Sequence, residues 1–202
     1  MSKIAAIILA AGQASRFRAA AGEAGPATKL VALLDGRPLV RHVAQAALAS
    51  RARPVIVVTG HAEAVVGEAL QGLPLAFTHN ADYATGIASS IQRGLAEVPS
   101  DCDGALVMLG DMPLVSADII DELISAFERN PEAKAVAPVR DGMRGNPVLL
   151  ARALFPAVAA LQGDVGARAL LAAAKGDVVE VPVDSRAVSF DVDTPEALSE
   201  KD

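Results

Sequence analysis

The sequence predicts a three-layer α/β fold, in which helices cover both faces of a mostly parallel, twisted β-sheet. Short apolar runs alternate with helical patterns along the chain. The runs Ile4–Leu9 and Gly104–Leu109 are apolar at nearly every position, which is typical of strands buried on both faces. Strands of this kind that alternate with helices form parallel sheets, and such sheets bind ligands beyond the carboxyl ends of their strands.

Two kinds of pattern place the individual elements. Continuous apolar runs predict strands at Ile4–Leu9, Pro54–Thr59, Leu73–Thr78, Gly104–Leu109, Lys134–Val139, Asn146–Leu150, Val178–Val183 and Ala187–Val192. Helical spacing of apolar residues predicts helices at Pro38–Ser50, Ala62–Gln71, Ile87–Glu97, Ala151–Leu161 and Val165–Ala174, and one after the capping residue Ser116 with the stripe Ile119, Ile120, Leu123, Ile124 and Phe127. A long loop is expected over Ala14–Thr28, and a frayed end at Glu200–Asp202.

Length and composition exclude several classes of protein. At 202 residues, the chain is expected to form one domain, residues 1–202. Its 18 basic and 24 acidic side chains give a net charge of −6 and only 3% of residues are aromatic, so neither nucleic acid nor a membrane is an expected partner. The single cysteine, Cys102, excludes an internal disulfide and a cysteine-based zinc cluster. We expect a cytoplasmic protein, because the apolar run after Lys3 is too short for a signal peptide or a membrane span.

The first expected strand ends in a turn of small residues with two cations nearby. The turn consists of Leu9, Ala10, Ala11 and Gly12, Arg16 follows in the long loop, and Lys29 closes that loop. Small side chains let a ligand approach the backbone, whose amide groups can bind phosphate, and the two cations suit a triphosphate. An ordinary turn with solvated charges is the alternative interpretation. The turn matches neither a dinucleotide-binding fingerprint nor a P-loop.

Two aspartates are candidates to hold a divalent cation. Asp111 follows the central strand, at the edge of the sheet where ligand phosphates would bind. Asp193 lies near the C-terminus, and in a strand Asp191 would point to the same face. Mg²⁺ usually takes one or two protein carboxylates together with phosphate oxygens. Each aspartate also has a structural interpretation: Asp111 can end a turn before Pro113, and Asp193 can flank a helix capped by Thr194.

Further polar residues follow the other expected strands. Ser89 and Ser90 lie near the start of the helix after Asn80, and Asp164 and Arg168 lie near the start of a later helix. Helix capping is the simpler role for the serines and for Asp164, whereas contact with an anion or a base is the functional one. The histidines share no metal-ligand spacing, and no Ser/His/Asp or Cys/His set is visible in the sequence.

Taken in order, these motifs resemble a known family. They are LAAGQASRF (9–17), Lys29, GIASSIQRG (86–94), GDMP (110–113), RGNP (144–147), GDVGAR (163–168) and DVDTPE (191–196). Over nearly its whole length the chain is similar to nucleotidyltransferases of the molybdenum-cofactor group, most of all to the cytidylyltransferases that join CTP to molybdopterin. Related guanylyltransferases usually have glycine where this chain has Ala11, which favours the cytidylyl branch. Arg18 replaces a usual glycine, and Asn146 stands where the family more often has histidine.

The resemblance implies a Rossmann-like nucleotidyltransferase fold, with a nucleotide-binding half over residues 1–115 and an acceptor-binding half over residues 116–202. It implies Mg²⁺ held by Asp111 and Asp193, and catalytic roles for Lys29, Arg16 and Asp111. The nucleotide-binding residues that it implies are Leu9, Ala10, Ala11, Gly12, Arg16, Lys29, Thr59, Gly60, Asn80, Ser89, Ser90, Gly110 and Asp111. The acceptor-binding residues that it implies are Met112, Pro113, Gly145, Asn146, Pro147, Gly163, Asp164 and Arg168.

The implied reaction transfers a nucleotidyl group from CTP to the terminal phosphate of molybdopterin and releases pyrophosphate. A molybdenum hydroxylase that receives the product would then be a partner. Two alternatives stay open. The chain could transfer GMP, UMP or CMP to another phosphorylated acceptor, such as a sugar or polyol phosphate. It could also be a carrier that binds the molybdenum cofactor without catalysis.

Overall fold

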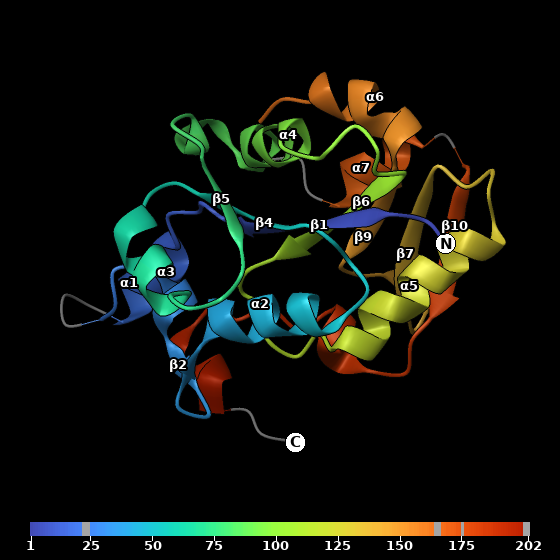
Figure 1. Cartoon of the computed structure of the whole chain (residues 1–202). Coiled ribbons are helices and arrows are strands. Elements are labelled where there is room, and N and C mark those ends of the chain that lie inside the picture. The colour runs from blue at the N-terminus through green and yellow to red at the C-terminus, as the bar shows by residue number, and fades with distance from the viewer. Residues whose placement is uncertain (22–24, 164–166, 175, 200–202) are drawn as a thin grey trace.

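A computed structural model of the chain describes residues 1–21, 25–163, 167–174 and 176–199. Within these residues, the main sheet has the strand order β10-β7-β9-β6-β1-β4-β5, with β8 paired to β7 (Figure 1). Its strands are β1 (Ile4–Ala10), β4 (Val55–Thr59), β5 (Ala76–His79), β6 (Gly104–Leu109), β7 (Ala135–Arg140), β8 (Met143–Arg144), β9 (Val148–Ala151) and β10 (Val178–Pro182). A small hairpin pairs β2 (Leu33–Leu34) with β3 (Arg37–Pro38).

The strand directions confirm the predicted mostly parallel sheet. Strand β1 runs parallel to both β4 and β6, β4 to β5, and β7 to β10. Only β9 interrupts this pattern within the order given above, since it is antiparallel to both of its neighbours, β6 and β7. The carboxyl ends of β1, β4 and β6 therefore meet at one edge of the sheet, which is where parallel α/β sheets bind ligands.

Helices cover both faces of the sheet (Figure 1). The α-helices are α1 (Ser15–Ala21), α2 (Leu39–Ala49), α3 (Glu63–Ala69), α4 (Ile87–Ala96), α5 (Ala117–Arg129), α6 (Phe155–Ala159) and α7 (Ala167–Ala173). Short 3₁₀ helices are η1 (Lys29–Val31), η2 (Tyr83–Thr85), η3 (Arg152–Leu154), η4 (Arg186–Val188) and η5 (Pro195–Ser199). Figure 1 places α2, α3 and α5 on one side of the sheet and α4, α6 and α7 on the other.

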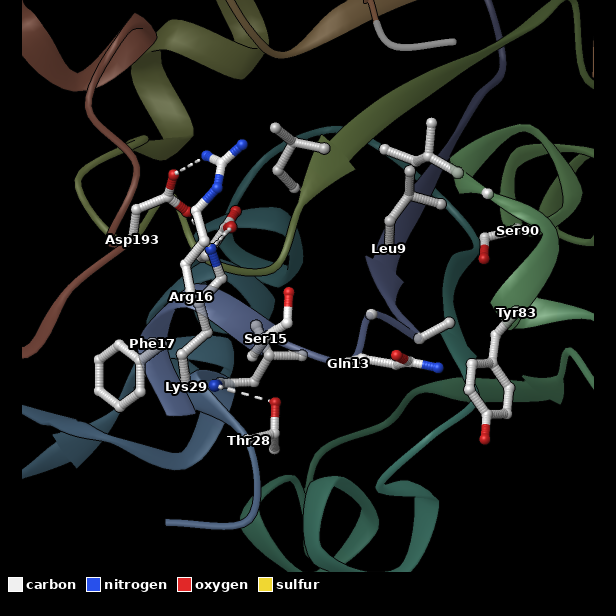
Figure 2. A pocket seen from close by; sticks show the side chains of 18 of the residues that line it. Leu9, Gln13, Ser15, Arg16, Phe17, Thr28, Lys29, Tyr83, Ser90 and Asp193 are labelled. Atoms are coloured by element: carbon white, nitrogen blue, oxygen red, sulfur yellow. Dashed lines mark hydrogen bonds and ion pairs between the residues drawn. The ribbon is translucent and has the colours of Figure 1, made fainter. Parts of the chain in front are cut away.

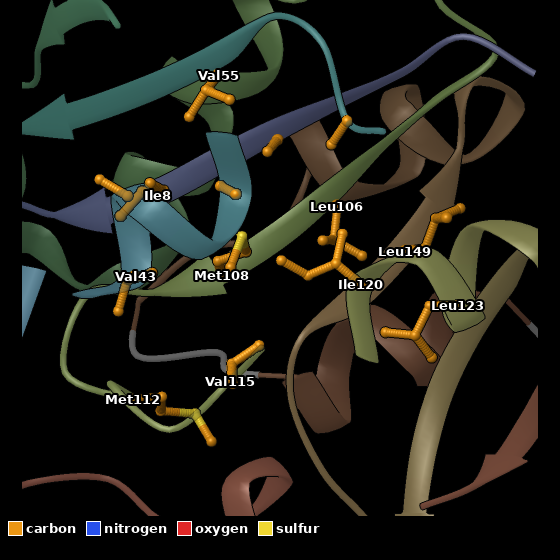
Figure 3. Packing of buried hydrophobic residues seen from close by; sticks show 14 of the residues in the cluster. Ile8, Val43, Val55, Leu106, Met108, Met112, Val115, Ile120, Leu123 and Leu149 are labelled. Atoms are coloured by element: carbon orange, nitrogen blue, oxygen red, sulfur yellow. The ribbon is translucent and has the colours of Figure 1, made fainter. Parts of the chain in front are cut away.

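The alternation of side chains along the strands separates two hydrophobic cores. Ile4, Ala6 and Ile8 of β1 pack with the first group of helices, whereas Ala5 and Ile7 pack with the second. The same alternation holds along β4 and β6, because successive strand residues point to opposite faces. Figure 3 shows the first core, in which α5 contributes Ile120 and Leu123 against Leu106, Met108 and Leu149 of the sheet. Buried strands flanked by two cores explain why the apolar runs are continuous.

Three predicted elements differ from the structure. Ala14–Thr28 is not a loop throughout, because Ser15–Ala21 forms α1. The predicted strand Ala187–Val192 is wrong: Ser185 caps the 3₁₀ turn η4 there, and burial of Val188 and Val192 produced the strand-like apolar pattern. The predicted helix Ala151–Leu161 is divided into η3 and α6, with Ala151 still in β9.

Two other parts of the prediction lie partly or wholly outside the described residues. Helix α7 begins at Ala167, inside the predicted helix Val165–Ala174. Residues 165 and 166, with which that prediction begins, are not described. The expected frayed end, residues 200–202, is likewise not described. Among the residues that the structure does describe, no helix is long and apolar enough to cross a membrane.

A third, smaller apolar cluster ties the C-terminal segment to the first helix. Phe17 of α1, Ala32, Leu39 and Val192 are buried together. The amide of Val192 also donates a hydrogen bond of 3.0 Å to the carbonyl oxygen of Asp111. These contacts hold the segment on both sides of Val192 beside the loop that follows β6, although the two segments are about 80 positions apart in the sequence (192 − 111 = 81).

Candidate functional site

A cavity of about 540 Å³ opens at the carboxyl edge of the sheet, beyond β1 and β6. It is lined by Leu9, Ala11, Gly12, Gln13, Ala14, Ser15, Arg16, Phe17, Thr28, Lys29, Leu30, Tyr83, Ala84, Gly86, Ile87, Ser90, Leu109, Asp111 and Asp193. Figure 2 shows Arg16 and Asp193 on one side of this space and Tyr83 and Ser90 on the other. The cavity therefore has a charged wall and a mostly neutral wall.

Lys29 lies at the centre of the charged wall. Its Nζ is 2.6 Å from Oδ2 of Asp111 and 2.7 Å from Oδ1 of Asp193. The residue begins η1, which buried Thr28 caps by accepting a hydrogen bond from the Leu30 amide. The Lys29 side chain is only 14% exposed. A capped turn on a buried threonine thus fixes the ammonium between two carboxylates from distant parts of the chain.

Arg16 extends this network toward the solvent. Its Nη1 lies 3.0 Å from Oδ2 of Asp193, the oxygen that does not face Lys29. The Arg16 side chain is 84% exposed, so this outer ion pair contributes little to stability. Its position on α1 leaves the guanidinium at the mouth of the cavity, where an anionic ligand could reach it.

A third carboxylate joins the two that contact Lys29. Oxygens of Asp111, Asp191 and Asp193 all lie within 4.8 Å of one another. The sequence predicts of Asp191 only that it shares a strand face with Asp193. The strand is absent, but the segment on either side of buried Val192 still brings both carboxylates to the same place. Three closely spaced carboxylates are an oxygen donor set that suits a hard cation such as Mg²⁺ or Mn²⁺.

The charges of this cluster shift the ionisation of its members. Desolvation raises the pKa of Asp191, and the neighbouring charges of Asp193 and Asp111 raise it further. The hydrogen bond from Lys29 lowers the pKa of Asp193, with Arg16 adding to the effect. Burial alone would lower the pKa of Lys29, but the attraction of Asp111 and Asp193 outweighs burial and leaves this pKa above its ordinary value of 10.5. Lys29 is therefore a cation at neutral pH.

Close backbone packing shapes the turn after β1. A Cβ on Gly60 would lie 2.8 Å from Cβ of Ala11 and 2.9 Å from Cβ of Tyr83. A Cβ on Gly110 would lie 2.9 Å from the carbonyl oxygen of Leu9, which accepts a hydrogen bond from the Gly110 amide. The two glycines thus let the ends of β4 and β6 approach the turn, and they support the cavity from behind rather than line it.

The neutral wall is organised by a buried asparagine. Asn80 is 4% exposed, and its Nδ2 donates hydrogen bonds to Oγ of Ser89 (2.9 Å) and Oγ of Ser90 (3.0 Å). Its Oδ1 accepts a hydrogen bond from the amide of Asp82. Asn80 therefore joins the end of β5 to the start of α4 and orients Ser90, whose side chain borders the cavity beside Tyr83 (Figure 2).

The structure brings many of the predicted nucleotide and metal residues together. The cavity is lined by Leu9, Ala11, Gly12, Arg16, Lys29, Ser90, Asp111 and Asp193. Ala10, Thr59, Gly60, Asn80, Ser89 and Gly110 stand behind that lining. Ala10 packs in the first core, and Thr59 is buried with its hydroxyl donating to Glu63 and to the carbonyl of Thr78. A supporting role follows from these positions.

The predicted acceptor residues that the structure describes are not among the residues that line the cavity. Met112 and Pro113 are buried, and Met112 belongs to the first core. The stretch Gly145-Asn146-Pro147 packs on η4: the Asn146 amide donates to the carbonyl oxygen of Val188, and a Cβ on Gly145 would lie 2.1 Å from that oxygen. The carbonyl of Gly163 accepts from the Ala88 amide in α4, beside the cavity. Asp164 and the side chain of Arg168 lie outside the described part of the chain.

Several residues of the site were not among the predicted site residues. Gln13, Thr28 and Tyr83 line the cavity, and Asp191 completes the carboxylate cluster. Gln13 stands inside the quoted first motif, and Asp191 opens the last one, so their neighbours were the available signal. Tyr83 and Thr28 lie in turns without a distinctive pattern, and only the fold brings them to the cavity.

The chain is similar in sequence to longer, curated proteins. A curated relative, "Bifunctional protein GlmU" of Leifsonia xyli subsp. xyli, is 30% identical over 164 residues, which are 80% of this chain and 29% of the relative. The chain thus spans less than a third of the length of such relatives.

Two solved structures share the fold. A nucleotidyl transferase from Methanothermobacter thermautotroptrophicus superposes with a TM-score of 0.83 at 22% identity, covering 98% of this chain and 94% of that one. Rv0371c of Mycobacterium tuberculosis H37Rv, in a complex with manganese, has a TM-score of 0.77 at 23% identity, covering 98% and 97%. The predicted α/β nucleotidyltransferase fold is confirmed by these superpositions.

The sequence also matches one family model over most of its length, from the first strand to the start of the last. This model describes the MobA-like NTP transferase domain and matches residues 6–178. The matched range contains Arg16, Lys29 and Asp111 of the charged wall. The chain therefore belongs to the family of MobA-like NTP transferase domains.

Proposed function

We propose that the protein transfers CMP from CTP to the terminal phosphate of molybdopterin and releases pyrophosphate. The observation that carries the proposal is the position of Lys29 between Asp111 and Asp193 in a cavity beside the first turn. This arrangement offers a cation, carboxylates for a metal ion and backbone amides in one place, which are the groups that a metal–triphosphate complex needs. The family match supports nucleotidyl transfer, and the ordered motifs support the choice of CTP and molybdopterin.

The chemistry requires no general base from the protein. A terminal phosphate of the acceptor is already anionic near about pH 7. One of its oxygens would form a bond to the α-phosphorus of CTP while the bond between that phosphorus and the β-phosphate oxygen breaks, so that pyrophosphate leaves with the bonding electrons. Catalysis then depends on positioning and on neutralising charge. Among the described residues that line the cavity there is no histidine to act as such a base.

Each charged residue has a role in this proposal. Lys29 and Arg16 would stabilise the negative charge of the triphosphate as the bonds change. Asp111 and Asp193, together with Asp191, would hold Mg²⁺, which supplies a positive charge at the phosphate oxygens when bound. Rv0371c, a protein of the same fold, was solved in a complex with manganese, which supports including a divalent ion in the proposal.

The neutral wall and the C-terminal part of the chain would bind the two other groups. Ser90 and Tyr83 would contact the nucleoside, with Asn80 orienting Ser90. The acceptor would bind on the side of residues 116–202, toward Gly145–Pro147 and residues 163–168, while residues 1–115 bind the nucleotide. A molybdenum hydroxylase would receive the product.

The test supplies the protein with Mg²⁺, molybdopterin and either CTP or GTP, and identifies the product by mass spectrometry together with released pyrophosphate. We expect the cytosine dinucleotide and an equal amount of pyrophosphate with CTP, and much less product with GTP. Product only with a sugar or polyol phosphate in place of molybdopterin would replace the acceptor in the proposal. Binding of molybdopterin without any pyrophosphate from any nucleotide would establish the carrier function instead.

A further inference from the structure

The Lys29 ammonium lies where the metal site would be expected. Its distances of 2.6 Å to Asp111 and 2.7 Å to Asp193 are those of short, charge-assisted hydrogen bonds. The contacted oxygens belong to two of the three carboxylates whose oxygens lie within 4.8 Å of one another. A Mg²⁺ ion would need carboxylate oxygens at about 2.0–2.1 Å. An ammonium and a divalent ion therefore cannot both lie against the two oxygens that Lys29 now contacts, Oδ2 of Asp111 and Oδ1 of Asp193.

The Lys29 side chain is one of those that line the cavity, so the cavity is open to a displaced ammonium. The Lys29 side chain is mostly buried, and its backbone is fixed in η1 by Thr28 and Leu30. The charged wall opens into the cavity, which Gly12, Gln13 and Ser15 also line. Leaving both carboxylates would therefore take the ammonium toward the cavity, where it needs a new anionic partner, because an unpaired and partly buried charge is costly.

We propose that Lys29 and a divalent cation compete for Asp111 and Asp193, so that the metal ion binds tightly only together with a nucleotide whose phosphates accept the displaced ammonium. The inference rests on the proposed function for the identity of that anion. Lys29 would thus prevent the carboxylates from holding a metal ion when no substrate is bound, and the metal ion and the nucleotide would bind together. Asp191 has no ion pair with a cation among the described residues, so it would be the carboxylate that first meets the incoming ion.

The test measures binding of Mn²⁺ to metal-free protein without nucleotide, by the loss of the electron paramagnetic resonance signal of free Mn²⁺. Lys29→Met removes the competing charge and keeps much of the side-chain volume. We expect it to bind Mn²⁺ at least about fivefold more tightly than the wild type, which is the lower end of a typical coupling between two sites. Lys29→Gln is a second, polar variant for which the same direction is expected.

Lys134→Met is the matched control. Lys134 makes a 2.6 Å ion pair with Asp177 at the surface, so its variant removes one lysine charge from a carboxylate outside the cavity. We expect this control to leave the affinity for Mn²⁺ unchanged. An equal gain in Lys134→Met and Lys29→Met would mean that net charge alone causes the effect, and it would overturn the proposal.

The wild-type protein provides a test that needs no variant. At a fixed concentration of free Mn²⁺, CTP should increase the amount of protein-bound Mn²⁺. If the wild type holds as much Mn²⁺ without nucleotide as with it, or if Lys29→Met and Lys29→Gln bind Mn²⁺ no better than the wild type, the competition is absent. These readouts involve no acceptor and no turnover, so a failure of the proposed transfer reaction would leave them interpretable.

Discussion

The Nζ of Lys29 lies 2.7 Å from Oδ1 of Asp193, a residue 164 positions later in the sequence. This contact closes the cavity on the side of the C-terminal segment, because the same aspartate also binds Arg16 of α1. The segment is held in place by Val192, which is fully buried beside Phe17 and Leu39. The apolar anchor Val192, between the two aspartates of the DVDTPE motif, thus positions both of them at the end of a strand far away in the sequence.

Removing the Asp111 carboxylate tests the charged wall. We expect Asp111→Asn to lower the rate of pyrophosphate release by roughly 10²–10³-fold, the range found when one preorganised electrostatic contact is lost. The substitution is nearly isosteric and leaves Lys29 paired with Asp193, so the circular dichroism spectrum should stay close to that of the wild type. Asp184→Asn removes an exposed carboxylate outside the cavity and serves as the control. A turnover number for Asp111→Asn within a factor of two or so of the control would contradict the role given to this residue.

Asp193 should stabilise the metal-free protein in a pH-dependent way. Its pKa is lowered in the folded chain from the ordinary value of 3.8, so its charged form favours folding. The contribution is fully present above about pH 3.8 and disappears as the pH falls through the lowered value. We expect Asp193→Asn to reduce the free energy of unfolding by less than about 1 kcal/mol at neutral pH, since the pair is partly exposed. Urea denaturation in the presence of a chelator, from neutral pH down to pH 3, measures this difference. A difference in the free energy of unfolding between wild type and variant that stays constant over this range would contradict the prediction.

Asp191 should have the opposite effect. Desolvation and its two acidic neighbours raise its pKa above 3.8, so its charged form disfavours folding. The cost is present above the raised value and vanishes as the pH falls below 3.8. We expect Asp191→Asn to make the metal-free protein slightly more stable at neutral pH and to require more Mg²⁺ for half-maximal activity. Lower stability together with an unchanged Mg²⁺ requirement would show that Asp191 does not belong to the metal cluster.

Replacing two glycines by alanine distinguishes the effect of close packing on stability from the effect of helix propensity. In Gly60→Ala the added Cβ would meet Ala11 and Tyr83 at less than 3 Å, so we expect a loss of roughly 1–3 kcal/mol in stability and a weaker affinity for nucleotide. Gly67 lies in α3 with open space around it, and Gly67→Ala should increase stability by about 0.5–1 kcal/mol. Thermal unfolding of both variants provides the comparison, and equal changes of the same sign would refute the packing argument.

Asn80 offers a test of the neutral wall. Asn80→Ala removes hydrogen bonds to Ser89, Ser90 and the Asp82 amide inside a buried site, which should cost about 1–3 kcal/mol in stability. Because Ser90 would lose its orientation, we expect the KM for the nucleotide to rise more than kcat falls. Ser89→Ala, which alters a residue outside the cavity lining, is the comparison. A pure loss of kcat with unchanged KM would place the role of Asn80 elsewhere.

The sequence predicts the sheet well because burial on both faces leaves a simple signal. Gly104–Leu109 has the predicted bounds, and Ile4–Leu9 differs from β1 by one residue, since continuous apolar runs need no tertiary information to be recognised. Ser116 caps α5 as expected, with its hydroxyl accepting from the Ile119 amide. Arg16, Lys29, Asp111 and Asp193 could be nominated because they stand next to such strands or inside quoted motifs, and the structure places them around one cavity.

The remaining features depend on contacts between distant segments. The alternating residues 187–192 resemble a strand, but Val188 and Val192 are buried by packing on other elements without joining the sheet. Helix α1 has a single large apolar side chain, Phe17, which is the residue that this helix contributes to the described members of the third cluster. The roles of Tyr83 and Asp191 follow from where the fold carries them, which neither spacing nor composition records.

The most direct test of nucleotidyl transfer at this site is an isotope experiment. The protein is incubated with Mg²⁺, molybdopterin and CTP that is radiolabelled at either the α- or the γ-phosphorus, in parallel with the Asp111→Asn variant. We expect the α label in the molybdopterin product, the γ label in pyrophosphate, and neither transfer in the variant. Appearance of the γ label in the acceptor, or equal transfer by the variant, would contradict the account.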